Sequence, residues 1–210
     1  MAAKQRIAVI GAGGCAREVA WTLRETPPFE LAGFVISDAS KRTPNDAEPL
    51  FDYDTLRDFD GFVLGVGAPA LRARLYDEAR ERFPNALWPA IVHPSVLGDR
   101  ASNAIGEGAV VCAGAILTVN VTLAPHVLVH YGSIISHESS VGRFSNLNPG
   151  CRIAGAVTIE DEVSVGLGAQ IIQKIRVGAR AVIGAGAVVI RDVAPGVTVA
   201  GVPARVLRVP

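Results

Sequence analysis

Residues 129–158 read VHYGSI ISHESS VGRFSN LNPGCR IAGAVT, five hexads that each open with Val, Ile or Leu. The same pattern runs from residue 105 to residue 189 without a polar or aromatic exception. The fifteen first-position residues are Ile105, Val111, Leu117, Leu123, Val129, Ile135, Val141, Leu147, Ile153, Ile159, Val165, Ile171, Val177, Ile183 and Val189. Four positions after each of them stands a small or β-branched residue, such as Ser139, Cys151 or Val157.

A period of six fits neither the helical repeat of 3.6 nor a simple two-residue alternation, and it is typical of hexapeptide solenoids. Three hexads then close one triangular coil, with the aliphatic residue pointing inward. Residues eighteen apart are expected to stack at the inter-strand spacing of about 4.8 Å. The glycines directly after the inward residue are expected at corners that need positive φ or close backbone approach; they are Gly106, Gly142, Gly166, Gly178 and Gly184.

The segment before the hexads has the pattern of an α/β unit. Residues 6–10 predict a strand, 11–14 (GAGG) a glycine turn, and 16–23 a helix. Further strands are predicted at 31–36, 61–66 and 86–92, with a charged helix at 68–82. We therefore expect a small Rossmann-like α/β domain over residues 1–92. Residues 93–210 would form the solenoid domain, closed by a C-terminal cap after Val189.

The carboxyl ends of these predicted strands are where open parallel sheets bind ligands. The glycine turn offers free N–H groups at a helix N-terminus, Ser37-Asp38 follows the second strand, and Gly67 follows the third. The order GxGGxxxE departs from the GxGxxG dinucleotide fingerprint. Phosphate binding and a turn needed only for packing are therefore equally compatible with the glycines.

Composition excludes several classes. The 210 residues carry no net charge, which argues against a nucleic-acid footprint or a polybasic membrane patch. No apolar run approaches the ~20 residues that span a bilayer. Three cysteines without metal-type spacing, and a start without a signal-peptide pattern, indicate a cytoplasmic protein with reduced thiols.

Chemistry on the solenoid must lie outside its aliphatic interior. The eighteen-residue coil places His137 beneath Gly155, with Glu138 next to it in sequence. A carboxylate that accepts an Nδ1–H bond would fix the imidazole tautomer and raise the basicity of the other nitrogen. The alternative is a surface His-Glu pair in a turn. The histidine spacing disfavours a three-histidine metal site, and Cys151 occupies an inward position unsuited to a nucleophile.

This order of parts resembles the bacterial sugar O- and N-acetyltransferases of the NeuD type, including those that acetylate 4-amino-6-deoxy sugars on a nucleotide. The resemblance rests on GAGGCAREVA (11–20), FVISD (34–38), LGVGAP (64–69), SHESSVGRFSNLNPGCRIAG (136–155), the hexads and VAGVPARV (199–206). It implies a left-handed parallel β-helix, a homotrimer with active sites between subunits, and acetyl-CoA as co-substrate; from the histidine spacing we expect no metal.

The resemblance also implies roles for individual residues. His137 would be the general base and Glu138 its partner. The nucleotide would be held by Gly13, Gly14, Cys15, Ser37, Asp38 and Gly67, with His130 near the sugar. Acetyl-CoA would contact Asn146, Gly155, Leu167 and Ala185, with the Gly155 N–H directed at the thioester oxygen. Two positions depart from the family pattern: Asn146 stands where a second histidine is common, and His130 where an asparagine is common.

The expected reaction is acetyl transfer from acetyl-CoA to the amine of a nucleotide-linked amino sugar, for surface polysaccharide or glycan synthesis. The alternatives are O-acetylation of a sugar such as sialic acid, a non-catalytic nucleotide-sugar-binding protein, and an NAD(P)-binding module. The last is disfavoured because no hydride-transfer site follows the glycine turn. The sequence leaves open whether the nucleotide is UDP, GDP or dTDP.

Overall fold

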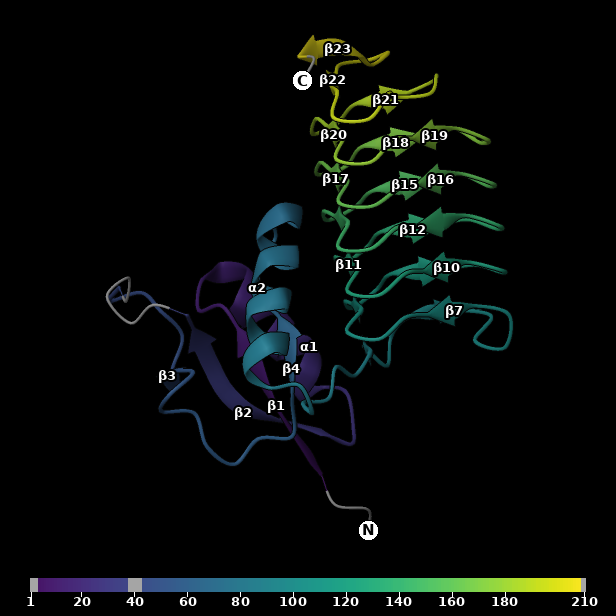
Figure 1. The fold of residues 1–210 in the computed structure, drawn as a ribbon. Helices are drawn as coiled ribbons and strands as arrows, with labels where there is room; N and C mark the ends of the chain where they lie inside the picture. Colours follow the sequence, from purple (N-terminus) through teal and green to yellow (C-terminus); the bar gives the residue numbers. More distant parts are fainter. Residues whose placement is uncertain (1–3, 38–42, 209–210) are drawn as a thin grey trace.

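The hexads form a three-sided β-helix in the computed structural model, which describes residues 4–37 and 43–208 (Figure 1). Inward aliphatic residues such as Val129, Ile135 and Leu147 are fully buried, and so are fifth-position residues such as Ser133 and Cys151. Ile105 is only partly buried because it lies in the first complete coil, at the open end. The β-helix is left-handed, which departs from the right-handed rule for parallel crossovers.

The strands of the β-helix form three parallel faces. Face 1 contains β5 (Ile91–Val92), β8 (Val110–Val111), β11 (Leu128–Val129), β14 (Asn146–Leu147), β17 (Ser164–Val165), β20 (Val182–Ile183) and β22 (Thr198–Ala200). Face 2 contains β6 (Leu97–Gly98), β9 (Ile116–Leu117), β12 (Ile134–Ile135), β15 (Arg152–Ile153), β18 (Gln170–Ile171) and β21 (Val188–Val189). Face 3 contains β7 (Ala104–Ile105), β10 (Thr122–Leu123), β13 (Ser140–Val141), β16 (Thr158–Ile159) and β19 (Arg176–Val177).

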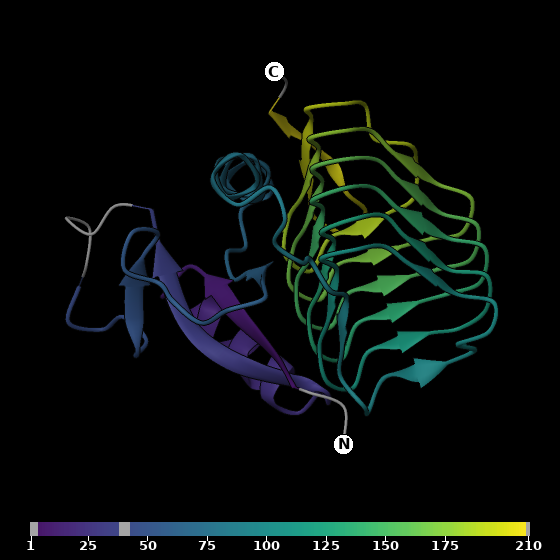
Figure 2. The same cartoon turned by 60° about the horizontal axis from the view of Figure 1, so that its bottom comes forward.

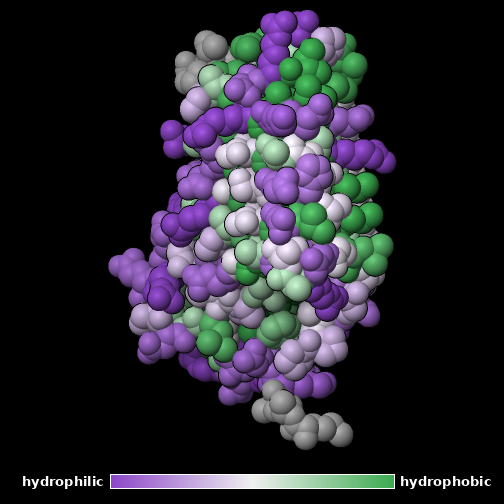
Figure 3. Space-filling view, turned by 90° about the vertical axis from the view of Figure 1, so that its right-hand side faces the viewer, coloured by the Kyte–Doolittle hydropathy of each residue, from purple (hydrophilic) through white to green (hydrophobic). Residues whose placement is uncertain are grey.

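The register confirms the predicted eighteen-residue coil, since Ile135 pairs with Ile153 and Val141 with Ile159. The predicted cap is also present: β23 (Arg205–Arg208) pairs antiparallel with β22 and covers the edge of face 1. Seen from the side opposite the N-terminal segment, apolar side chains gather along one margin of the β-helix beside polar ones (Figure 3). This columnar arrangement follows from stacking equivalent hexad positions.

The corner glycines behave differently from the prediction in one respect. Positive φ falls on the fourth hexad position, two residues later than predicted, and non-glycine residues such as His126 and Phe144 also adopt it there. Gly142 instead allows close approach, because a Cβ added to it would lie 2.4 Å from the carbonyl carbon of Glu160. The close-approach part of the prediction is therefore confirmed, and the positive-φ part is wrong.

A four-stranded parallel sheet lies beside face 1, in the order β3-β2-β1-β4 (Figures 1 and 2). Its elements are β1 (Gln5–Ile10), α1 (Gly14–Arg24), β2 (Phe29–Ile36), β3 (Leu50–Asp52), β4 (Gly61–Leu64) and α2 (Pro69–Arg82). The strands and helices predicted for this segment are present with slightly shifted ends, and β3 is an additional edge strand.

The strand predicted over residues 86–92 is not continuous. Leu87 makes a single bridge to Gly61 in the N-terminal segment, whereas Ile91–Val92 is β5 and pairs with β8 of the β-helix. Pro89 separates the two because it has no N–H to donate to a ladder. The first rung of the β-helix thus begins at Ile91, and the domain boundary between residues 92 and 93 stays a prediction.

Apolar clusters join the N-terminal segment to face 1. In one cluster, Ala16 and Val19 of α1 pack with Val110 and Leu128 of the β-helix. In another, β4 and α2 pack with Phe144. Burial of such surface contributes about 25 cal/mol per Å². The sheet is thereby held against one particular face of the prism.

Candidate functional site

His137 and Glu138 form a hydrogen-bonded pair at the corner between faces 2 and 3, directly after β12. Nδ1 of His137 lies 2.9 Å from Oε2 of Glu138, and both side chains are more than half exposed. The hydrogen bond and charge of His137 lower the pKa of the Glu138 carboxyl, with a further hydrogen bond from Asn120 one coil below. Since the carboxylate occupies Nδ1, the Nε2 atom is left available for a substrate.

Gly155 lies on the imidazole of His137, as the eighteen-residue spacing predicts. A Cβ added to Gly155 would come within 2.3 Å of Nε2 and Cε1, so only glycine leaves the ring in place. Gly155 lies in the turn after β15, and its N–H donates to no backbone carbonyl of the described residues. The corner therefore combines an oriented imidazole with a free backbone donor.

Shallow grooves lie on both sides of this corner. The groove on face 2 has a volume of about 340 Å³ and includes Ser136 and Ala154, which immediately precede His137 and Gly155. The groove on face 3 has a volume of about 390 Å³ and includes Ser140, the second residue after Glu138. Both are open surfaces on which another chain or an extended ligand can lie.

The residues predicted to contact acetyl-CoA are dispersed in one copy of the chain. Leu167 and Ala185 are exposed and follow β17 and β20, at the corner between faces 1 and 2. Gly155 lies at the next corner. Asn146 lies in β14 on face 1 and is only 3% exposed. A single protomer therefore does not bring these four residues into one groove.

The predicted nucleotide-binding residues gather at the carboxyl edge of the parallel sheet. Gly13 and Gly14 are exposed at the start of α1, Ser37 follows β2, and Gly67 follows β4. Asp38 lies outside the described residues. Cys15 is half-buried, and burial raises the pKa of its thiol to about 11, so it is a neutral group at physiological pH.

This edge meets the β-helix at the two positions that depart from the family pattern. A Cβ on Gly67 would lie 3.4 Å from Nδ2 of Asn146. His130, at the corner after β11, is 5% exposed, and burial lowers the pKa of its imidazole. The structure thus brings Gly67, Asn146 and the adjoining corner of His130 into one junction between the sheet and face 1.

The sequence did not indicate Arg72, which ties this junction together. Its side chain is fully buried, and its guanidinium donates to the carbonyl oxygens of Leu64, Val66 and His126. Burial lowers its pKa to about 10, so it remains a cation. In the sequence it is one of several arginines in a charged helix, and nothing in that pattern distinguishes it.

The predicted base and the predicted nucleotide edge lie on different sides of one prism. His137 lies at the corner between faces 2 and 3, whereas the small sheet packs on face 1 (Figure 2). Each half of the candidate site is formed within one copy. The complete site is not.

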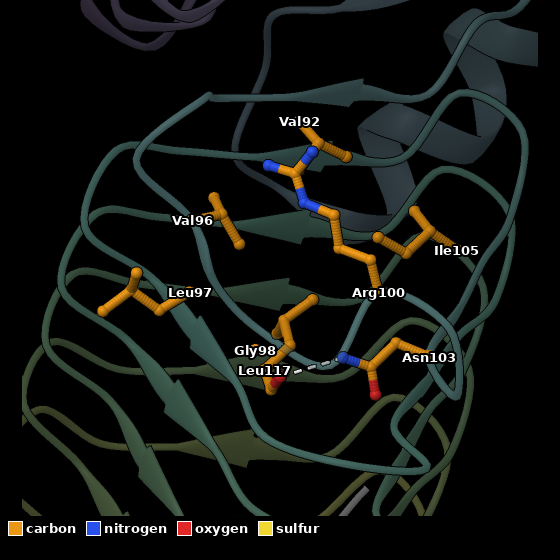
Figure 4. Close-up of a pocket in the computed structure, with 8 residues that line it drawn as sticks. All are labelled: Val92, Val96, Leu97, Gly98, Arg100, Asn103, Ile105 and Leu117. Atoms are coloured by element: carbon orange, nitrogen blue, oxygen red, sulfur yellow. Dashed lines mark hydrogen bonds between the residues drawn. The ribbon is translucent and has the colours of Figure 1, made fainter.

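An apolar pocket of about 280 Å³ occupies the open end of the β-helix (Figure 4). Val92, Val96, Ile105 and Leu117 line it, and Arg100 is the one ionisable side chain among the lining residues. It exposes the unfilled core of the first coil and offers no acid, thiol or imidazole. The corner at His137 is therefore a better candidate for the site of chemistry than this pocket.

Neither a metal cluster nor a membrane-spanning helix is found within residues 4–37 and 43–208. No three His, Cys, Asp or Glu side chains gather there as a metal site. No helix in these ranges is long and apolar enough to cross a membrane.

Comparison with known proteins gives likenesses over most of the chain. PerB from Caulobacter crescentus, solved with CoA and GDP-perosamine, superposes with a TM-score of 0.85 at 25% identity, covering 96% of this chain and 97% of that one. The acetyltransferase domain of PglB from Neisseria gonorrhoeae, solved with acetyl coenzyme A, gives 0.84 at 29% identity, covering 97% and 100%.

Sequence comparison alone reaches less far. A 2,3,4,5-tetrahydropyridine-2,6-dicarboxylate N-acetyltransferase of Staphylococcus aureus is 47% identical over 55 residues, 26% of this chain and 23% of that protein. No family model matches the chain. The structural likenesses confirm the resemblance to nucleotide-amino-sugar N-acetyltransferases with a hexapeptide-repeat β-helix.

Proposed function

We propose that the protein transfers an acetyl group from acetyl-CoA to the amine of a nucleotide-linked amino sugar, of the 4-amino-4,6-dideoxy type. The observation that carries the proposal is the His137 imidazole, bonded to Glu138 and lying on Gly155. The pair occurs on a fold shared with structures that hold CoA and GDP-perosamine. Such a reaction serves the synthesis of surface polysaccharides or glycans.

The chemistry follows from the available atoms. The sugar amine attacks the thioester carbonyl carbon while Nε2 of His137 takes a proton from the nitrogen. Glu138 stabilises the imidazolium that forms, and the Gly155 N–H is the donor for the oxyanion. The C–S bond then breaks, and the CoA sulfur leaves as the thiol after receiving the proton. A base positioned in this way contributes ~10²–10⁴-fold to the rate.

The N-terminal sheet supplies nucleotide binding in this proposal, in the manner of a Rossmann-like domain. The N-terminus of α1, with Gly13 and Gly14, presents free N–H groups to a diphosphate. Cys15, Gly67 and the Ser37-Asp38 segment lie in the sequence at the same strand ends and would contact the nucleoside. Open parallel sheets bind ligands at this edge.

A second copy of the chain completes the site. A sugar held at face 1 of one copy reaches His137 only if that histidine comes from a neighbour, because the two lie on different sides of one prism. A homotrimer with three equivalent interfaces satisfies this requirement by closed symmetry. Acetyl-CoA would then lie between neighbouring β-helices, with Gly155 on one side and Leu167 and Ala185 on the other.

The test is release of free CoA thiol with GDP-, UDP- and dTDP-linked 4-amino-4,6-dideoxyhexoses, and with sialic acid as a hydroxyl acceptor. His137→Ala is expected to lower kcat by ~10²-fold or more with the oligomer intact. A matched replacement, His93→Ala, lies outside the site and should leave turnover unchanged. Near-wild-type turnover of His137→Ala removes this residue as the base, and exclusive transfer to sialic acid replaces N-acetylation by O-acetylation.

A further inference from the structure

Glu18 of α1 reaches across the junction to the corner of the β-helix that follows β11. Its Oε1 accepts a hydrogen bond of 2.8 Å from the Tyr131 hydroxyl, and its Oε2 lies 3.7 Å from Nδ1 of His130. The His130 side chain is 6% exposed and that of Glu18 is 40% exposed. One carboxylate therefore approaches a buried imidazole from the solvent-accessible side.

Two buried polar atoms at the junction between the sheet and face 1 have no hydrogen-bond partner among the described residues. They are Nδ1 of His130 and Oδ1 of Asn146, in residues that are 5% and 3% exposed. Buried side-chain atoms of this kind are rare in native proteins and call for a water or ligand. Since Asn146 also adjoins Gly67 at the end of β4, the unpaired atoms lie next to the proposed nucleotide edge.

Packing alone does not explain why a carboxylate occupies position 18. The neighbouring α1 residues Ala16 and Val19 already pack with Leu128 of face 1, so an apolar residue at position 18 would extend that contact. A carboxylate near a buried imidazole instead costs desolvation unless both are well paired. The 3.7 Å separation shows that the pair is not closed in this structure.

The chemistry of these groups indicates what they recognise. A carboxylate facing Nδ1 favours the Nδ1–H tautomer, which leaves Nε2 of His130 as an acceptor. Together with Oδ1 of Asn146 it forms a set of two acceptors. Hydroxyl and amine groups of a sugar are donors that match such a set, whereas a phosphate brings only negatively charged acceptors.

We infer that Glu18 is a positioning residue that orients His130, and that His130 with Asn146 recognises the amino sugar of the substrate and not its nucleotide. The identity of the ligand rests on the proposed function. The inference moves Asn146 from the predicted acetyl-CoA contact to the sugar side, because Asn146 adjoins Gly67 on face 1 and is remote in the coil from Gly155.

The binding test uses Glu18→Gln, which keeps the shape and an oxygen for Tyr131. Calorimetry compares GDP-, UDP- and dTDP-linked 4-amino-4,6-dideoxyhexoses with GDP, UDP and dTDP. Loss of a hydrogen bond to a charged group should weaken binding of the accepted nucleotide sugar about tenfold and leave the free nucleotide unchanged. Glu25→Gln, at the exposed end of the same helix, is the matched control, and Tyr131→Phe removes only the hydroxyl bond.

Kinetics and a double variant separate recognition from a structural role. The KM for the nucleotide sugar should rise about tenfold while the KM for acetyl-CoA and the melting temperature stay unchanged. Glu18→Gln combined with His130→Gln should be no worse than His130→Gln alone, because Glu18 acts through His130. The inference would be overturned if the effects of the two substitutions on KM multiplied in the double variant. It would also be overturned if Glu18→Gln weakened the binding of the free nucleotide as much as that of the nucleotide sugar.

The same data distinguish this inference from the proposed function. Wild-type protein that binds the nucleotide sugar but releases no thiol contradicts the proposed reaction alone. Wild-type protein that transfers acetyl normally, with Glu18→Gln unchanged in sugar affinity, contradicts the role of Glu18 alone. Wild-type protein that binds none of the nucleotide sugars contradicts both.

Discussion

Acid should destabilise the protein through His126, which is enclosed in an aromatic column at the junction with α2. Its ring stacks on Phe144 one coil above, with centroids 5.1 Å apart and planes within 6°, and lies 4.2 Å from the Tyr76 ring. The side chain is 0% exposed, and neither ring nitrogen has a hydrogen-bond partner within the part of the chain that the structure describes. Burial, with the nearby charges of Arg72 and Arg143, lowers its pKa from 6.5 to about 3.

The sign and size of the effect follow from proton linkage. The folded-state pKa is the lower one, so the unfolded chain binds the proton more readily. Full stability is present above pH 6.5 and is lost as the pH falls from 6.5 towards 3. Each unit costs about 1.36 kcal/mol, so acidification to pH 4.5 should remove about 2.7 kcal/mol through His126.

His126→Phe isolates this contribution. The backbone there has φ 61°, and Phe144 adopts φ 58° at the equivalent position one coil above, so an aromatic side chain fits the conformation. Urea unfolding of wild type and variant, at fixed protomer concentration and at pH 7.5 and 4.5, gives the difference in unfolding free energy. Between pH 7.5 and pH 4.5, the unfolding free energy of the variant relative to wild type should rise by about 2.7 kcal/mol. His93→Asn, outside the column, is the control, and a shift below about 0.5 kcal/mol would refute the reasoning.

Two further predictions concern the proposed active site. Gly155→Ala places a methyl group 2.3 Å from Nε2 of His137 and should lower kcat by ~10²-fold by displacing the ring; unchanged turnover with an unchanged melting temperature would contradict the geometry. Co-expression of His137→Ala with Gly14→Asp chains, each inactive alone, should restore about a quarter of the sites if each site combines two randomly assembled copies. An inactive mixed oligomer, isolated through two different affinity tags, would place the whole site within one copy.

The β-helix could be predicted because its contacts are periodic in sequence. Residues such as Ile135 and Ile153 meet because they are eighteen apart, and the same arithmetic placed Gly155 on His137. The hexad pattern did not predict the backbone conformation at the fourth position. A non-glycine residue such as Phe144, with φ 58°, gives no indication in the sequence that its φ is positive.

The junction with the small sheet could not be predicted in this way. Tyr131 and Glu18 are 113 residues apart, and Arg72 and His126 are 54 apart, with no repeat linking them. Which face of the prism receives α1 depends on apolar side chains such as Leu128 that point outward from face 1. In sequence these residues look like any other aliphatic neighbour of an inward position.

The left-handed backbone at the fourth hexad position explains why two adjacent residues can form the hydrogen-bonded pair that we propose as catalytic. In a regular strand, neighbouring side chains point to opposite sides, so a His-Glu sequence would separate its groups. Glu138 has φ 55°, and the turn this produces brings its carboxylate to 2.9 Å from the imidazole of His137. Asn120 repeats the conformation one coil below, with φ 54°. The geometry of the pair is therefore set by the coil itself.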